Sequence, residues 1–373
     1  MTGAAKHNPI LECLRGLAAL AVCLLHLTIV GFGPIPMHWA FVGNLGVDLF
    51  FVLSGFLIAR CVLVPDRFRL GEYLTHRSRR ILPAYFACLV IVLLLVDARQ
   101  MFNPDFGKNL LLHVTLLHGW SQPFYQSING PFWTLSHEWC FYLFMALIAP
   151  LLRGRAFWIV VAAMAAGSLT FRSLLQAGVI APPLGFQHPL CFLDRFACGM
   201  AAARCALGAA ADAKLLRWGP ASALLLAGGL LLAWAVWRYL ATAAQIPAAK
   251  LQELEGTHQF FRLVQKSRTL SVFMPLAFSA GMGTLLVVFW LKPRSLAALL
   301  RRTPLPWMGK VSYATYLWHL PLMHGLSRAF KTHPDSWLAN PWLALGGVLA
   351  LVYLFSWIFY EGFERPYLKR RPS

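Results

Sequence analysis

The sequence predicts an all-α, polytopic membrane protein of about ten transmembrane helices. Of its 373 residues, 58% are hydrophobic and only 13% are charged, and the mean hydropathy is +0.60. Soluble globular chains contain roughly 45–50% apolar and about 25% charged residues. Too few charges remain to cover a water-facing surface, so the surrounding medium is expected to be lipid.

Hydrophobic runs of spanning length recur along the whole chain. A transmembrane helix needs about 20 mostly apolar residues. On that template, the expected helices cover residues 10–30, 42–61, 80–97, 131–152, 156–175, 188–206, 219–238, 270–290, 307–327 and 341–361. The stretch Leu110–His118 is too short to span and is expected to form a re-entrant or interfacial segment.

The distribution of basic residues predicts the orientation, because Lys and Arg gather in cytoplasmic loops. Residues 31–41 contain neither, whereas residues 60–80 contain six arginines. The second connection is therefore expected on the cytoplasmic side together with the N-terminus, and an even number of helices returns the C-terminus to that side. The connection 239–269 disagrees, because it is expected outside yet carries Lys250, Arg262, Lys266 and Arg268.

The formal net charge of +19 has the same topological explanation. Nucleic-acid binding would need a soluble basic face or an aromatic stacking platform, and the sequence shows neither. The eight cysteines fall mostly in apolar runs, with no CxxC pair and no Cys/His spacing typical of a metal site. No metal is expected.

The first expected helix carries two polar residues on one face. Ionisable residues in lipid are costly, so each is a candidate functional residue. Eleven positions separate Arg15 from His26; eleven helical steps return to within about 20° of the same face and rise about 16 Å. A fixed cation at the inner end is thus aligned with a titratable base deeper in the membrane.

Other helices add polar residues at depths similar to that of His26. These residues are Asp48, Glu138, Asp194 and His319. Polar residues of this kind also form simple hydrogen bonds between helices, and for each residue alone the two interpretations have about equal weight. The common depth on five helices favours a shared site.

Six motifs, in this order along the chain, resemble the membrane acyltransferase-3 family. They are LRGLAALAVCLLHL around Arg15 and His26, GVDLFFVLSGFLI (Gly46–Ile58), RSRRILPAY (Arg77–Tyr85), PFWTLSHEWCFY (Pro131–Tyr142), SYATYLWHLP (Ser312–Pro321) and FERP (Phe363–Pro366). The resemblance implies a bacterial inner-membrane enzyme with ten helices. The resemblance also implies that this enzyme moves an acyl group, most often acetyl from acetyl-CoA, to a sugar hydroxyl of lipopolysaccharide, exopolysaccharide or another envelope polysaccharide.

Some members of that family carry an extra helix and an SGNH hydrolase-like domain after the membrane core. This sequence stops at Ser373, shortly after the FERP motif. A single acyltransferase domain over residues 1–373, with no appended domain, is therefore expected.

Acyl transfer to an alcohol needs a base for the hydroxyl proton and a donor for the developing oxyanion. His26 is the expected base, because an imidazole titrates near neutral pH. Asp48 or Glu138 is expected to orient it, as the carboxylate does in a Ser-His-Asp triad. His319 is expected to assist with the acceptor. Direct transfer and a covalent acyl-His26 intermediate are both open.

The arginines at the inner face are expected to bind the acyl-CoA donor. Guanidinium groups suit phosphate, and Arg15, Arg77 and Arg80 are the candidates. The pantetheine arm would then run inward with its thioester near His26, and Trp133 and Tyr142 are expected to line that passage.

Three alternatives compete with this interpretation. A succinyl or other short acyl group is as compatible with the residues as acetyl. A transporter or flippase also buries ionisable residues near the membrane midplane, but it typically shows paired, repeated halves, which this sequence lacks. A non-catalytic acyl-CoA-binding scaffold is the third alternative.

Overall fold

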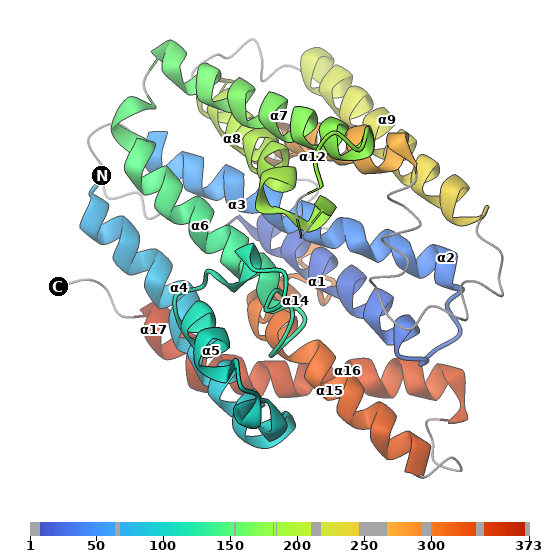
Figure 1. Ribbon diagram of the computed structural model, residues 1–373. Coiled ribbons are helices and arrows are strands. Elements are labelled where there is room, and N and C mark those ends of the chain that lie inside the picture. The colour runs from blue at the N-terminus through green and yellow to red at the C-terminus, as the bar shows by residue number, and fades with distance from the viewer. Residues whose placement is uncertain are drawn as a thin grey trace.

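The computed structural model describes residues 8–63, 68–152, 154–181, 183, 185–209, 218–245, 267–291, 300–332 and 339–369. All regular secondary structure in these ranges is helical (Figure 1). The helices are α1 (Pro9–Ile29), α2 (Met37–Ala40), α3 (Leu45–Leu63), α4 (Leu70–Ile91), α5 (Phe106–Val114), α6 (Phe132–Ile148), α7 (Gly154–Gln176), α8 (Leu193–Ala209), α9 (Trp218–Ala243), α12 (Met274–Leu291), α14 (Leu305–Lys310), α15 (Ser312–Thr332), α16 (Pro341–Phe359) and α17 (Arg365–Lys369). The all-α prediction is confirmed.

Seven helical segments in the described ranges are long and apolar enough to cross a membrane. They are Pro9–Ile29, Phe41–Leu63, Leu70–Val96, Gly154–Gln176, Ala221–Thr242, Thr269–Leu291 and Pro341–Leu368. The chain is thus a multi-pass membrane protein. Of the remaining expected spans, α6 and α8 have only 17 residues each, and α15 interrupts its apolar sequence with His319, His324 and Arg328. The total of ten, and the side on which each terminus lies, stay predictions.

The largest difference from the expected helices is at the start of α4. This helix begins at Leu70 rather than near residue 80, so that Arg77 and Arg80 lie within it. Its first half is polar, and a search for apolar runs detects only the second half. The 239–269 connection is partly accounted for: α9 continues to Ala243, and a π-helical turn, Thr269–Phe273, leads into α12. Residues 246–266, with three of its four basic residues, lie outside the described ranges.

Helices α1 and α3 occupy the middle of the bundle (Figure 1). On one side α8 packs on α3 and is flanked by α7 and α12, and on the other α14 and α15 pack on α1. The α3–α8 crossing is close because it contains glycines. A Cβ atom on Gly55 would lie 2.2 Å from the Phe196 carbonyl oxygen, and one on Gly199 would lie 2.0 Å from that of Val52. Small residues are what allow such approach between membrane helices.

Candidate active site

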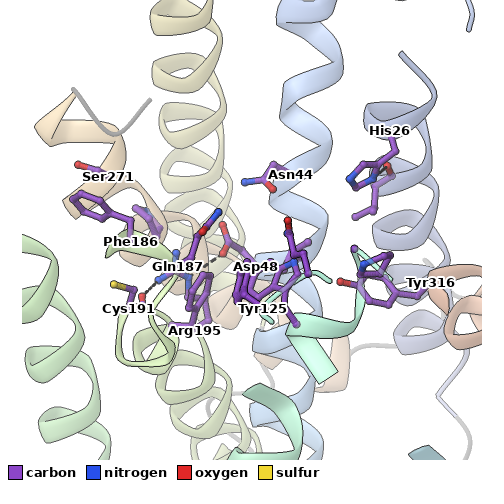
Figure 2. A pocket seen from close by; sticks show the side chains of 18 of the residues that line it. His26, Asn44, Asp48, Tyr125, Phe186, Gln187, Cys191, Arg195, Ser271 and Tyr316 are labelled. Carbon is purple, nitrogen blue, oxygen red and sulfur yellow. Dashed lines mark hydrogen bonds and ion pairs between the residues drawn. The ribbon is translucent and has the colours of Figure 1, made fainter. Parts of the chain in front are cut away.

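Two cavities lie inside the bundle and hold most of the polar residues singled out in the sequence. The first, here called the histidine cavity, has a volume of about 160 Å³ and includes His26, Asp48, Tyr125, Trp133, Arg195 and His319 in its wall (Figure 2). The second, the arginine cavity, has a volume of about 90 Å³ and includes Arg15, Ser54, Arg77, Arg80, Glu138 and Tyr142.

The two cavities are stacked along the helix axes. On α1, Arg15 lines the arginine cavity, and His26 lines the histidine cavity three turns later. On α15 the same order holds for Ser312 and His319, and α3 and α6 run in the opposite direction between them. Val47 and Tyr316 belong to both walls. The cavities are therefore neighbours separated along the bundle axis.

His26 is paired with another histidine. Its Nδ1 lies 3.0 Å from the Val22 carbonyl oxygen and 3.2 Å from Nε2 of His319. Nδ1 of His319 lies 3.1 Å and 2.9 Å from the carbonyl oxygens of Thr315 and Tyr316. A carbonyl can only accept, so Nδ1 of His319 is protonated, and its Nε2 accepts a hydrogen bond from the protonated Nδ1 of His26.

This assignment leaves Nε2 of His26 as an unprotonated acceptor at the histidine cavity. Among the described residues, it has no hydrogen-bond partner in the protein. A hydroxyl that enters the cavity can therefore donate to it. The arrangement is that of a neutral imidazole poised as a general base.

The carboxylate expected to orient His26 is elsewhere. Asp48 lines the same cavity, but its Oδ1 accepts from Nε of Arg195 at 2.9 Å. Glu138 accepts from Tyr142 at 2.5 Å and from Ser54. In the described ranges neither carboxylate is hydrogen-bonded to His26. His319 takes that position instead.

Glu138 also lies at a different level from the one expected, because it lines the arginine cavity. The reason is the connection before α6, which folds into the bundle. Its residues Tyr125, Gln126 and Gly130 line the histidine cavity, so α6 begins deeper than a count from the membrane surface assumes.

Trp133 lies with these residues and contacts the rings of His137 and Phe192. It lines the histidine cavity, away from the three arginines, whereas Tyr142 is beside them.

A buried ion network forms the wall of the histidine cavity opposite His26. Arg195 donates to Asp48 and, at 2.8 Å, to Asp194. Asp194 also accepts from Arg172 of α7 at 2.7 Å. All four side chains are at least 90% buried, and their formal charges cancel. Burial of charge is tolerated in such fully paired sets.

Arg172 was not among the expected site residues. Its guanidinium also donates to Ser168 at 2.8 Å and to the carbonyl oxygens of Cys191 and Val272 at 2.6 and 2.9 Å. The sequence contained a signal, since an arginine inside an otherwise apolar helix is a candidate by default.

The arginine cavity has an excess of positive charge. Among its described lining residues are three arginines and one carboxylate, Glu138. Glu364 is buried outside this lining and interacts electrostatically with Arg80 and Arg15. Nε of Arg77 and Nη2 of Arg80 are buried without an acceptor among the described residues. Unpaired buried donors are costly, so these groups fit a site for an anionic ligand.

Tyr125 is a second residue that the sequence did not single out. It lies in the connection before α6, is only 4% exposed, and lines the histidine cavity (Figure 2). Its hydroxyl has no partner among the described residues. Burial raises the pKa of Tyr125 well above its usual range, so the hydroxyl stays protonated and can donate into the cavity.

Comparison with known proteins agrees with this geometry. Residues 8–361 match the family model described as an acyltransferase domain. The chain belongs to this acyltransferase family. The match includes both cavities and leaves only short segments at either end of the sequence.

Several known proteins are similar to the chain. Peptidoglycan O-acetyltransferase OatA of Listeria monocytogenes is 25% identical over 363 residues, 90% of this chain and 52% of that protein. BcsY of Komagataeibacter xylinus is 25% identical over 371 residues, 95% of this chain and 81% of that protein. The O-acetyl transferase of Shigella phage Sf6 is 27% identical over 157 residues, 38% of this chain and 46% of that protein. The chain thus spans about half the length of OatA. No solved structure matches it significantly.

Proposed function

We propose that the chain is a membrane O-acyltransferase that moves an acyl group, most simply acetyl, from acyl-CoA to a hydroxyl of a cell-envelope polysaccharide. The observation that carries the proposal is the contact between Nδ1 of His26 and His319, which leaves Nε2 of His26 as an acceptor at one cavity while three arginines line the next. The first cavity offers a base to a hydroxyl, and the second offers cations to phosphate. Membership of the acyltransferase family supports the same chemistry.

The base step begins at His26. The acceptor hydroxyl donates its proton to Nε2, and the hydroxyl oxygen attacks the thioester carbonyl carbon. The carbon–sulfur bond breaks, the ester carbon–oxygen bond forms, and the CoA thiolate leaves to be protonated. His319 holds the imidazole in the correct tautomer throughout, since its Nε2 accepts from Nδ1 of His26.

The developing oxyanion needs a donor within the histidine cavity. The hydroxyl of Tyr125 is buried, protonated and unpartnered among the described residues. We assign it this role. An acyl-His26 intermediate uses the same groups: Nε2 first attacks the thioester carbon and the CoA thiolate leaves, and the acceptor hydroxyl then attacks the acyl carbon while Nε2 leaves and takes up the hydroxyl proton.

The donor is proposed to bind at the arginine cavity. Arg77 and Arg80 stand one turn apart on α4 and face Arg15 of α1 across the cavity. Their guanidinium groups can form charge-assisted hydrogen bonds to the phosphates of CoA. Tyr142, under the Arg77 guanidinium at 5.7 Å, would line the path of the pantetheine arm.

The acceptor is proposed to occupy the histidine cavity. Aromatic and amide side chains contribute to its wall, among them Trp133, Asn44 and Gln187 (Figure 2). Rings and amides suit a hydroxylated, uncharged ligand such as a sugar, and OatA of Listeria acts on peptidoglycan by name. A polysaccharide acceptor is consistent with both.

The test is transfer of labelled acetyl from acetyl-CoA by the purified full-length protein in lipid nanodiscs, with envelope glycan fragments as acceptors. We expect labelled ester on the glycan, and a loss of about 10²–10⁴-fold in His26→Ala. His324→Ala, on the exposed part of α15, is the matched control. Label on neither glycan nor protein would overturn the proposal, and succinyl-CoA in parallel would identify a different acyl group.

A further inference from the structure

Only a thin layer separates the two cavities. Val47 of α3 and Tyr316 of α15 contribute to the wall of each, and Tyr316 is 8% exposed. The hydroxyl of Tyr316 is hydrogen-bonded to that of Thr134 of α6 at 2.7 Å. Its ring meets the edge of Phe50, with the centroids 6.0 Å apart. Three helices thus meet at one tyrosine.

This tyrosine stands directly beside the histidine pair. The Tyr316 carbonyl oxygen lies 2.9 Å from Nδ1 of His319, and the two rings are 5.8 Å apart. On the other side of Tyr316, one turn earlier on α15, Ser312 lines the arginine cavity. An acyl group carried from the arginines to Nε2 of His26 has to pass this level.

We propose that Tyr316, held by Thr134 and backed by Val47, is the partition between acyl donor and acceptor, and that it keeps water of the histidine cavity away from the thioester while the donor is still in the arginine cavity. The inference rests on the proposed function. It assigns to Tyr316 a role in specificity, namely the choice of the acceptor hydroxyl over water.

The chemistry explains why such a partition is needed. A base that activates a sugar hydroxyl also activates water. Water attack on the thioester carbon breaks the carbon–sulfur bond and forms a free carboxylic acid, while the thiolate takes up a proton. The acyl donor is then consumed without product. Exclusion of water from a closed site is a general means of suppressing such side reactions.

The two parts of the tyrosine have separable roles. The ring fills the layer between the cavities, and the hydroxyl fixes the ring to α6 through Thr134. Tyr316→Phe keeps the ring and removes the hydrogen bond to Thr134, whereas Tyr316→Ala removes both. The ratio of hydrolysis to transfer should therefore rise in the order wild type, Tyr316→Phe, Tyr316→Ala.

The experiment uses the full-length protein in nanodiscs with acetyl-CoA as the probe. Free CoA is quantified by chromatography with and without glycan acceptor, and labelled ester gives the transfer rate. We expect the hydrolysis-to-transfer ratio to rise at least about tenfold in Tyr316→Ala and about two- to threefold in Tyr316→Phe. Tyr353→Ala is the matched control, because Tyr353 is a 7% exposed tyrosine that lines neither cavity.

The outcomes separate this inference from the proposed function. An unchanged ratio in a folded, transferring Tyr316→Ala protein overturns the partition alone, and so does an equal rise in Tyr353→Ala. A wild-type protein that neither transfers nor hydrolyses acetyl-CoA overturns both proposals. If Tyr316→Ala does not fold, Val47→Ala and Thr134→Val take its place, and a ratio unchanged in both overturns the partition.

Discussion

The partner of His26 is a neutral imidazole, that of His319, and not a carboxylate. The imidazole of His319 accepts one hydrogen bond through Nε2 and, unlike a carboxylate, adds no negative charge to the cavity. In this chain His319 is itself fixed by two backbone carbonyls one turn earlier on α15. The orientation of His26 therefore depends on the helix geometry of α15 more than on a distant carboxylate.

Removal of His319 should slow the chemistry and leave donor binding intact. We expect His319→Ala to lower kcat about 10–100-fold with little change in KM for acetyl-CoA, because the tautomer of His26 is no longer enforced. His319→Gln retains an acceptor oxygen and should recover part of the loss. Steady-state transfer rates of the two variants test this prediction. Equal rates for His319→Ala and His319→Gln would contradict an orienting role of His319.

In the proposed reaction, the arginines bind the nucleotide end of the donor. Arg80→Ala and Arg77→Ala should raise KM for acetyl-CoA about tenfold or more, in line with the loss of a charge-assisted hydrogen bond. The same variants should match the wild type with acetyl-pantetheine, which carries no nucleotide phosphates. Arg79→Ala, in the same turn but outside the cavity lining, is the control. A KM increase that persists with acetyl-pantetheine would argue against phosphate binding.

At the scale of helices, the ion network joins α3, α7 and α8. Asp194 accepts from both arginines, whereas Asp48 accepts, within the described part of the chain, only from Arg195. Asp194→Asn leaves two buried cations short of a partner and should destabilise the protein by about 3–5 kcal/mol. Asp48→Asn should cost less. Thermal unfolding in detergent measures which of the two variants is less stable. A larger loss of stability in Asp48→Asn would show that the network is not centred on Asp194.

The crossing of α3 and α8 places Asp48 next to Arg195. Gly199→Ala would put a Cβ atom 2.0 Å from the Val52 carbonyl oxygen, which forces the helices apart and should cost about 1–3 kcal/mol. In Gly167→Ala on α7, no described atom beyond the chain neighbours and the local helix backbone lies within 4 Å of the new Cβ, so helix propensity should make that change neutral or stabilising. Equal melting temperatures for the two variants would rule out close packing at Gly199.

Across the whole molecule, the sequence predicted the apolar helices well. The expected helices 10–30, 156–175 and 341–361 correspond to α1, α7 and α16 within a few residues, because long apolar runs admit no other structure in lipid. The first half of α4 could not be predicted in this way, because it is helical but polar and does not form an apolar run.

The contents of the site were harder to predict than the helices. Spacing on α1 put Arg15 and His26 on one face of the helix, and the structure places them at two cavities that are stacked along it. Residue spacing predicts which side chains share a face of one helix, but it does not predict which other helix packs against that face. Asp48 and Arg195 are 147 positions apart, and the infolded connection before α6 displaced Glu138. Both facts depend on tertiary packing.

The stacking of the cavities predicts that the proposed reaction is sided. Acetyl-CoA supplied from the side of the arginine cavity should support transfer, and the same concentration supplied from the other side should not. Proteoliposomes of defined orientation, with acetyl-CoA either inside or outside, measure this. Equal rates in both orientations would mean that the donor does not enter by the arginine cavity.

The same stacking has an electrical consequence. The acetyl group leaves its bonding electron pair on the sulfur, so the charge that crosses the membrane depends on where the proton of the acceptor goes. That proton has two routes: release on the side of the histidine cavity, or transfer to the departing thiolate on the side of the arginine cavity. Transfer to the thiolate leaves neutral products on both sides and moves no net charge, whereas release separates a proton from the thiolate, at about 2.3 kcal/mol per elementary charge for each 100 mV. The response of turnover to an imposed voltage thus reports where that proton goes.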